Sequence, residues 1–145
     1  MSKVEDFLTA EEEQAIIKAI KNAEKNTSGE IRVHIEKTTE KPPMERALEV
    51  FYSLKMDATE LKNGVLFYIA VESKKFAILG DEGINTLVPA NFWDDEKEIL
   101  ATHFSKLENA IGLQRAIYEV GEKLKMYFPY QSDDSNELTD EISKG

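Results

Sequence analysis

The sequence predicts an α/β fold: a three-layer α/β/α sandwich around a small mixed sheet that combines a parallel pair of strands with an antiparallel hairpin. Three observations support this fold class. Helical and strand-like periodicities alternate along the chain. The two clearest strands are separated by a helical segment, as in a right-handed parallel crossover. A third strand follows the second after a short polar reversal, as in a hairpin.

The first predicted helix begins with a capping box, in which Thr9 is followed three residues later by Glu12. Apolar residues then recur at helical spacing to about residue 25, namely Ile16, Ile17, Ile20 and Ala23. Polar residues 26–29 end this helix. Alternating apolar and polar residues around Val33 predict a strand that is buried more heavily on one face.

The middle of the chain predicts a helix followed by two strands. Pro42 and Pro43 suit the start of a helix, because proline fixes φ and the first amide groups need no partner. Residues 64–71 are apolar throughout, which indicates a central strand covered on both faces. Residues 72–75 form a polar reversal into a third strand at residues 76–79, so these two strands should be antiparallel.

The remaining elements are helical. Asp81 can cap a short helix from Glu82 to Val88, and Asn91 can cap a second helix that runs to about residue 106. A last apolar-striped helix ends before Pro129. We therefore expect one α/β domain over residues 1–130, and an acidic, disordered tail over residues 131–145.

Composition excludes several functional classes. The formal net charge of −10 disfavours binding to nucleic acid or to an anionic membrane surface unless a metal or a local basic patch intervenes. The chain has no cysteine, which excludes disulfides, thiolate zinc sites and cysteine nucleophiles. The N-terminus lacks the apolar core of a signal peptide, and no apolar stretch approaches the length of a membrane span. We expect a soluble, cytoplasmic protein without membrane insertion.

Three polar loops are predicted to meet at one edge of the sheet. Glu30 precedes the first strand and Asn63 precedes the second, and the third strand runs backwards, so Asp81 at its end returns to the same edge. Carboxylate and amide oxygens suit a hard cation such as Ca²⁺ or Mg²⁺. Asp57 and Glu60, in the loop before the second strand, are additional candidate metal ligands.

Simpler roles exist for these residues. Asp81 can serve only as a helix cap, and Glu30 only as a surface residue of a strand. His34 and His103 have no metal-binding or catalytic partner at a recognisable spacing, so packing or surface roles account for them. The sequence contains no nucleophile elbow and no P-loop. The catalytic residues of an enzyme therefore cannot be assigned from the sequence.

Three blocks of the chain occur in the order seen in TPM domains. They are Thr27–Glu36, Lys62–Leu66 and Ile78–Ile84, and the later Val88–Trp93 is similar to the soluble bacterial branch of that family. The resemblance covers about residues 5–130. It implies an α/β/α sandwich, a divalent-cation site, and the phosphatase or nucleotide-phosphohydrolase activity attributed to thylakoid-lumen and some bacterial members. Many relatives carry a signal peptide, a membrane segment and a glycine-rich tail, and this sequence shows none of them.

Two functional hypotheses follow. In the first, a cytoplasmic TPM domain binds Ca²⁺ or Mg²⁺ at Glu30, Asn63 and Asp81, and hydrolyses a phosphate-containing small molecule. Asp81 would then be a metal ligand, Glu30 a ligand or general base, and Asn63 an orienting donor. In the second, the domain is a non-catalytic interaction or assembly module whose acidic surface or tail meets a basic protein partner that the sequence does not identify.

Overall fold

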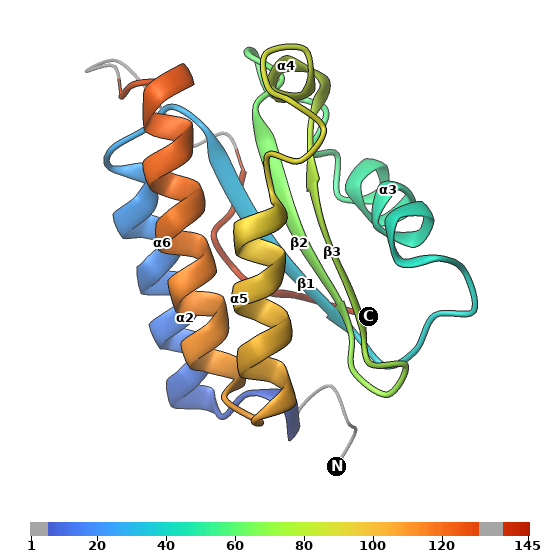
Figure 1. Cartoon of the computed structure of the whole chain (residues 1–145). Coiled ribbons are helices and arrows are strands. Elements are labelled where there is room, and N and C mark those ends of the chain that lie inside the picture. The colour runs from blue at the N-terminus through green and yellow to red at the C-terminus, as the bar shows by residue number, and fades with distance from the viewer. Residues whose placement is uncertain (1–5, 131–137) are drawn as a thin grey trace.

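A computed structural model describes residues 6–130 and 138–145 of the chain and confirms the predicted α/β/α sandwich (Figure 1). The helices are α2 (Ala10–Glu24), α3 (Pro43–Ser53), α4 (Glu82–Asn85), α5 (Asp94–Ser105) and α6 (Asn109–Tyr127). The strands are β1 (Glu30–Glu36), β2 (Gly64–Ala70), β3 (Lys75–Gly80) and β4 (Ser143–Lys144). No helix in these two ranges is both long enough and apolar enough to cross a membrane.

The central sheet has the strand order β3-β2-β1-β4. β1 and β2 are parallel and in register from the Glu30–Gly64 pair to the Glu36–Ala70 pair. β2 and β3 form the predicted antiparallel hairpin. The fourth strand was not predicted: the short β4 pairs in parallel with the outer edge of β1 at His34 and Ile35.

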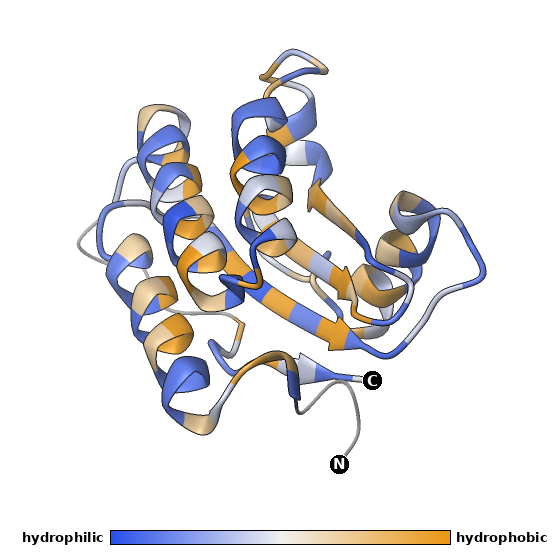
Figure 2. Cartoon of the chain, turned by 60° about the horizontal axis from the view of Figure 1, so that its bottom comes forward, coloured by the Kyte–Doolittle hydropathy of each residue, from blue (hydrophilic) through white to orange (hydrophobic). Residues whose placement is uncertain are grey.

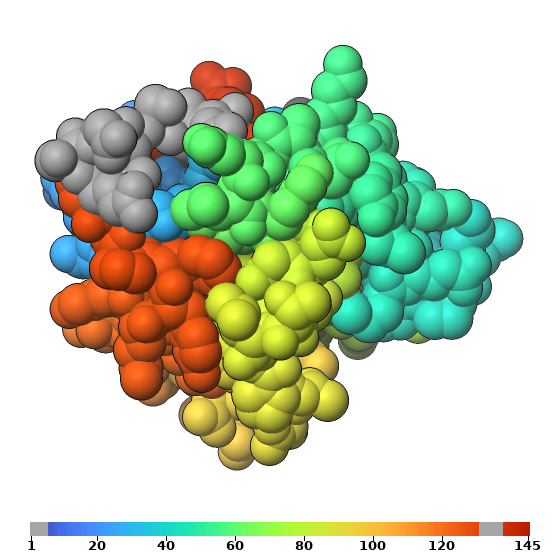
Figure 3. Space-filling view, turned by 90° about the horizontal axis from the view of Figure 1, so that it is seen from above, coloured from blue at the N-terminus to red at the C-terminus, as the bar shows by residue number. Residues whose placement is uncertain are grey.

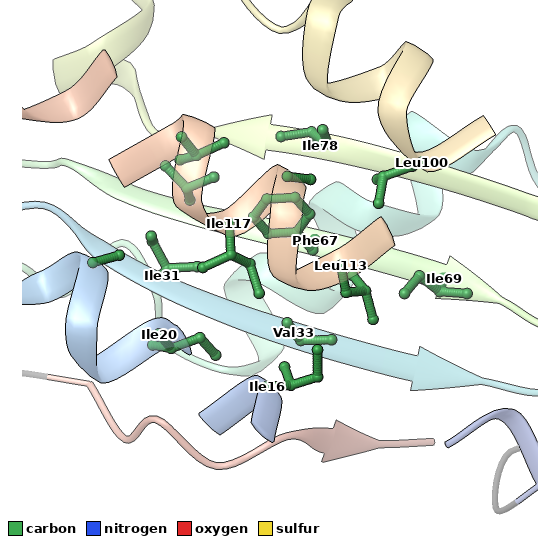
Figure 4. Packing of buried hydrophobic residues seen from close by; sticks show 14 of the residues in the cluster. Ile16, Ile20, Ile31, Val33, Phe67, Ile69, Ile78, Leu100, Leu113 and Ile117 are labelled. Carbon is green, nitrogen blue, oxygen red and sulfur yellow. The ribbon is translucent and has the colours of Figure 1, made fainter. Parts of the chain in front are cut away.

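Two hydrophobic cores hold the layers together. Helices α2, α5 and α6 cover one face of the sheet, and α3 covers the other (Figure 1). On the three-helix side, Val33 of β1 and Phe67 of β2 pack with residues such as Ile20 and Ile117 (Figure 4). The alternate residues of β2, including Leu66, pack on the α3 side. β2 is buried along its whole length, which explains why its sequence is apolar without alternation.

The boundaries of two helices differ from the prediction. The Asp81 side chain caps α4 as expected, by accepting a hydrogen bond from the Glu82 backbone nitrogen at 2.7 Å. However, α4 ends at Asn85, and α5 begins at Asp94. Trp93 is the residue before α5 and supplies no side-chain cap, whereas acidic residues fill the first turn of that helix, where the helix dipole favours negative charge.

The C-terminal segment also differs from the predicted disordered tail. Residues 131–137 lie outside the described residues, but residues 138–145 run along β1 and end in β4. Ile142 packs against the larger core and Leu138 against the smaller one. The Gly145 backbone nitrogen donates a hydrogen bond to the Ile35 carbonyl at 2.9 Å. These contacts order a segment whose polar composition alone indicates disorder.

Candidate functional site

The structure brings the three predicted loops to one edge of the sheet. The Glu30 backbone nitrogen donates a hydrogen bond to the Asn63 carbonyl at 3.3 Å, and the Asp81 backbone nitrogen donates one to the Gly64 carbonyl at 2.9 Å. Seen from this end, the segment before β2 and the segment around α4 lie side by side (Figure 3). The start of β1, the start of β2 and the end of β3 are therefore adjacent, as their strand directions require.

The side chains of Glu30 and Asp81 contact different neighbours at this edge. Gly64 lies between them in the sheet, because it pairs with Glu30 and accepts the Asp81 backbone hydrogen bond. A Cβ on Gly64 would lie 3.3 Å from the Met56 carbonyl oxygen and 3.8 Å from the Leu138 side chain. Met56 and Leu138 thus lie next to Gly64. We refer to the β1 end of this edge as the Glu30 side and to its β3 end as the Asp81 side.

On the Asp81 side, one carboxylate oxygen is buried without a hydrogen-bond partner. Asp81 is 7% exposed, and its Oδ1 accepts the hydrogen bond that caps α4. Its Oδ2 has no hydrogen-bond partner among the described residues. Burial raises the pKa of Asp81 and outweighs the hydrogen bond from the Glu82 backbone and the charge of Lys62, which both lower it; the charges of Glu82 and Asp57 add smaller increases. The carboxylate is therefore poorly compensated, which is unusual for a buried acidic group.

The loop before β2 brings backbone carbonyl oxygens close to Gly83, two residues after Asp81. A Cβ on Gly83 would lie 2.3 Å from the Leu61 carbonyl oxygen and 2.4 Å from the Lys62 carbonyl oxygen. The Lys62 ammonium group donates a hydrogen bond to the Asp57 carbonyl oxygen, and Lys62 has a positive φ of 52°. The backbone of this loop therefore passes directly over the start of α4.

The other predicted ligands differ in position. Asp57 is half-buried and close enough to Asp81 to influence its pKa. Asn63 is 2% exposed, and its side-chain nitrogen has no hydrogen-bond partner among the described residues. Glu60 lies in the same loop with an exposed side chain. The charge of Asp57 thus acts on Asp81, whereas Asn63 adjoins Glu30 through the hydrogen bond between the Asn63 carbonyl and the Glu30 backbone nitrogen.

On the Glu30 side, the structure reveals two acidic residues that sequence reasoning missed. Glu30 Oε1 accepts a hydrogen bond from the Leu138 backbone nitrogen at 2.7 Å, and Glu24 Oε2 accepts one from the Ile31 backbone nitrogen at 3.0 Å. Burial raises the pKa of Glu24 to about 9, with further contributions from a hydrogen bond to Asp140 and from the charges of Asp140 and Glu30. The Glu24 carboxyl group therefore keeps its proton at neutral pH. Only the folded C-terminal segment brings Asp140 here, so the sequence offers no signal for this pair.

A second polar cluster lies farther along β1, on the side of the sheet that α3 covers. Glu36 accepts hydrogen bonds from Arg46 of α3, with Nε–Oε2 at 2.9 Å, and from Tyr68 of β2. His34 contacts Glu36 through Nε2 at 3.0 Å and Ser143 through Nδ1 at 2.9 Å. This cluster joins α3, the sheet and β4, and it gives His34 the packing role that its sequence context indicates.

The described side chains offer few charged ligands for a divalent cation. Among residues 6–130 and 138–145, no group of three or more His, Cys, Asp or Glu side chains is arranged to hold a metal ion. A cation on the Asp81 side would therefore depend on backbone carbonyls and the Asn63 amide in addition to carboxylates. Ca²⁺ and Mg²⁺ accept such oxygen ligands. The unpartnered Asp81 oxygen and the nearby carbonyls fit a hard cation, whereas they do not fit a metal that prefers imidazole ligands.

Comparisons with known proteins give the family. No curated protein matches the chain. Among solved structures, the chain is similar to the BA42 protein from the psychrophilic bacterium Bizionia argentinensis sp. nov., determined by NMR. The two share 54% sequence identity over 100% of both chains, with a TM-score of 0.92. A family model described as the TPM domain, and named TPM_phosphatase, matches residues 1–123. The chain therefore belongs to the TPM domain family.

Proposed function

We propose that this TPM domain binds a divalent cation, Ca²⁺ or Mg²⁺, on the Asp81 side of the sheet edge. One observation supports the proposal above all: a carboxylate oxygen of Asp81 is buried without a hydrogen-bond partner among the described residues. Leaving a charged group in this state costs free energy, and burial accordingly raises the pKa of Asp81. A bound cation would offset that cost.

The remaining ligands would come from the loop before β2. Asp57 would provide a second carboxylate, and Asn63 would provide its side-chain oxygen or orient a ligand. The carbonyl oxygens of Leu61 and Lys62 lie beside Gly83, close to the start of α4. Glu60 and Glu30 are the weaker candidates, because Glu60 is exposed and Glu30 accepts a hydrogen bond from Leu138. The proposal therefore gives Asp81 the leading role.

Calorimetric titration with CaCl₂ and MgCl₂ tests this proposal on the full-length chain. Asp81→Asn keeps an oxygen that can cap α4 but removes the charge, and we expect it to weaken binding at least about tenfold. Asp94→Asn is the matched control, because Asp94 is an exposed acid at the start of α5. Equal cation affinity in the wild type and Asp81→Asn would refute the role of Asp81.

A finer proposal is metal-assisted phosphate-ester hydrolysis, which the name of the matching family model supports. A bound cation would supply charge stabilisation at a phosphoryl oxygen. Release of phosphate from ATP, ADP and p-nitrophenyl phosphate would be measured with and without cation, for the wild type and Asp81→Asn. Metal-dependent release that Asp81→Asn abolishes supports a phosphohydrolase. Cation binding without any release favours the alternative of a non-catalytic interaction module.

A further inference from the structure

A hollow of about 670 Å³ lies at the opposite end of the sheet from Asp81. It is bounded by the β2–β3 turn, the end of α5 and the segment just before α2, and its apolar lining includes Phe7, Ile69, Phe76 and Phe104. The elements that bound it lie at the lower end of the molecule in Figure 1, which Figure 2 turns toward the reader. The volume is in the range of small-molecule sites in proteins.

Aromatic side chains give this far-end hollow defined walls. The ring of Phe104 contacts Phe7 edge-on at a centroid distance of 5.5 Å, and Phe76 edge-on at 5.6 Å. The Asn109 side-chain nitrogen donates a hydrogen bond to the Phe7 carbonyl at 3.1 Å, which fixes the segment before α2 against the start of α6. The apolar surface is therefore formed by three mutually packed elements, so its shape exists before any ligand binds.

The charge at this hollow is opposite to that of the chain as a whole. The lining includes Lys74 from the β2–β3 turn and Lys75 at the start of β3, together with the single acidic residue Asp6. Both lysine side chains are exposed, and neither forms an ion pair within the described residues. The charge beside this apolar hollow is therefore locally positive, although the chain as a whole has a net charge of −10.

We propose that the far-end hollow binds a small amphipathic anion, with its apolar body among Phe7, Phe76 and Phe104 and its acidic head at Lys74 and Lys75. Lysine attracts an anion as a mobile point charge rather than through a rigid fork, so a carboxylate or sulfonate head suits it. An aromatic ring system or a medium-length acyl chain suits the aromatic walls. A doubly charged, fully polar ligand does not match this lining.

Fluorescence titration with 1-anilinonaphthalene-8-sulfonate tests the proposal, because this probe combines an aromatic body with one negative charge. We expect saturable binding to the full-length chain and displacement by decanoate. Decanol and decyltrimethylammonium should displace the probe at least about tenfold less well, because neither has a negative head. Lys74→Gln/Lys75→Gln should weaken probe binding at least about fivefold, whereas the exposed control pair Lys18→Gln/Lys25→Gln should leave it unchanged.

A second variant tests the apolar part of the site. Ala101 lines the hollow, so Ala101→Trp should fill it and abolish saturable binding while circular dichroism remains that of the wild type. If Ala101→Trp does not fold, the lysine variants decide the question. No saturable binding to the wild type, unchanged affinity in Lys74→Gln/Lys75→Gln, or equal displacement by decanol would each overturn the proposal. Asp81→Asn should bind the probe normally, which separates this site from the cation site.

Discussion

The Asp81 backbone nitrogen donates a hydrogen bond to the Gly64 carbonyl at 2.9 Å, which ties the end of β3 to the start of β2. Because Gly64 also pairs with Glu30, this bond fixes Asp81 on the far side of β2 from the first strand. The backbone nitrogen of Asp81 is thus hydrogen-bonded, while one of its carboxylate oxygens is buried without a hydrogen-bond partner in the described part of the chain. The strand pairing thus positions a charged group that the surrounding protein compensates poorly.

The close approach of the loop before β2 to α4 makes Gly83 a sensitive position. A Cβ at Gly83 would lie 2.3 Å from the Leu61 carbonyl oxygen, and 2.4 Å from that of Lys62, so the loop would have to move. We expect Gly83→Ala to lower the free energy of unfolding by about 1–3 kcal/mol and to weaken cation binding. Urea unfolding and calorimetry would measure both effects. Thr86→Ala, at an exposed position just after α4, is the control, and equal behaviour of the two variants would contradict the proposed contact.

Stability should fall steeply in acid because of the cluster at Glu36. Burial raises the pKa of Glu36, but hydrogen bonds from Arg46, Tyr68 and His34 outweigh burial and lower the pKa from 4.5 to about 2. The stabilisation is therefore complete above about pH 5 and is lost as the pH falls toward 2. Burial also lowers the pKa of His34, which adds to the loss below its ordinary value of 6.5.

Thermal unfolding between pH 7 and pH 3 would test this dependence on Glu36. At pH 7, we expect Glu36→Gln to lower the free energy of unfolding by about 2 kcal/mol. Between pH 5 and pH 3, the melting temperature of Glu36→Gln should fall less than that of the wild type, because the variant has lost the group that titrates. Parallel curves for the two proteins over this range would show that Glu36 does not control the acid response.

The C-terminal segment should protect the outer edge of β1. Removal of residues 138–145 deletes the partly buried Leu138 and Ile142, as well as the Gly145 hydrogen bond to Ile35. We expect the free energy of unfolding to fall by about 2 kcal/mol, and amide exchange in residues 32–36 to accelerate. Lys144→Ala, which removes only a part-exposed ion pair with Glu13, serves as the control. Unchanged exchange in β1 after the deletion would show that this segment does not protect the strand.

Removing one partner of the ion pair between Lys123 and Glu96 should lower the free energy of unfolding. Replacing both partners with apolar residues should lower it much less. Lys123 Nζ lies 2.8 Å from Glu96 Oε1, and Glu96 is fully buried. We expect Lys123→Met to lower the free energy of unfolding by about 3 kcal/mol, because it leaves a buried charge without its partner. The double variant Lys123→Met/Glu96→Leu should recover most of that loss. Urea midpoints would reveal the difference, and a double variant no more stable than the single one would disprove this explanation.

Much of the fold could be predicted because local patterns reflect burial. The alternation around Val33 predicted β1, and the uninterrupted apolar residues of β2 predicted a central strand covered on both faces. The meeting of Glu30, Asn63 and Asp81 at one edge followed from strand direction alone. That inference needed only a parallel pair and a hairpin, both of which short connections specify.

The remaining features depend on contacts between residues that are distant in the chain. Strand β4 is two residues long, which is too short to show a periodicity. Its Ser143 side chain forms a hydrogen bond with His34, which lies 109 positions earlier in the chain. The approach of Met56 and Leu138 to Gly64 depends on packing between segments that are distant in the sequence. The raised pKa of Glu24 arises from burial that a sequence pattern does not report.

Residue-resolved NMR during titration with Ca²⁺ and Mg²⁺ tests the cation proposal most directly. We expect saturable shifts of backbone amides concentrated in residues 57–63 and 80–83, with smaller effects at the start of β1. In Asp81→Asn, these shifts should need at least about tenfold more cation. Shifts confined to the acidic residues 131–145, or identical titrations of the wild type and Asp81→Asn, would contradict the proposal.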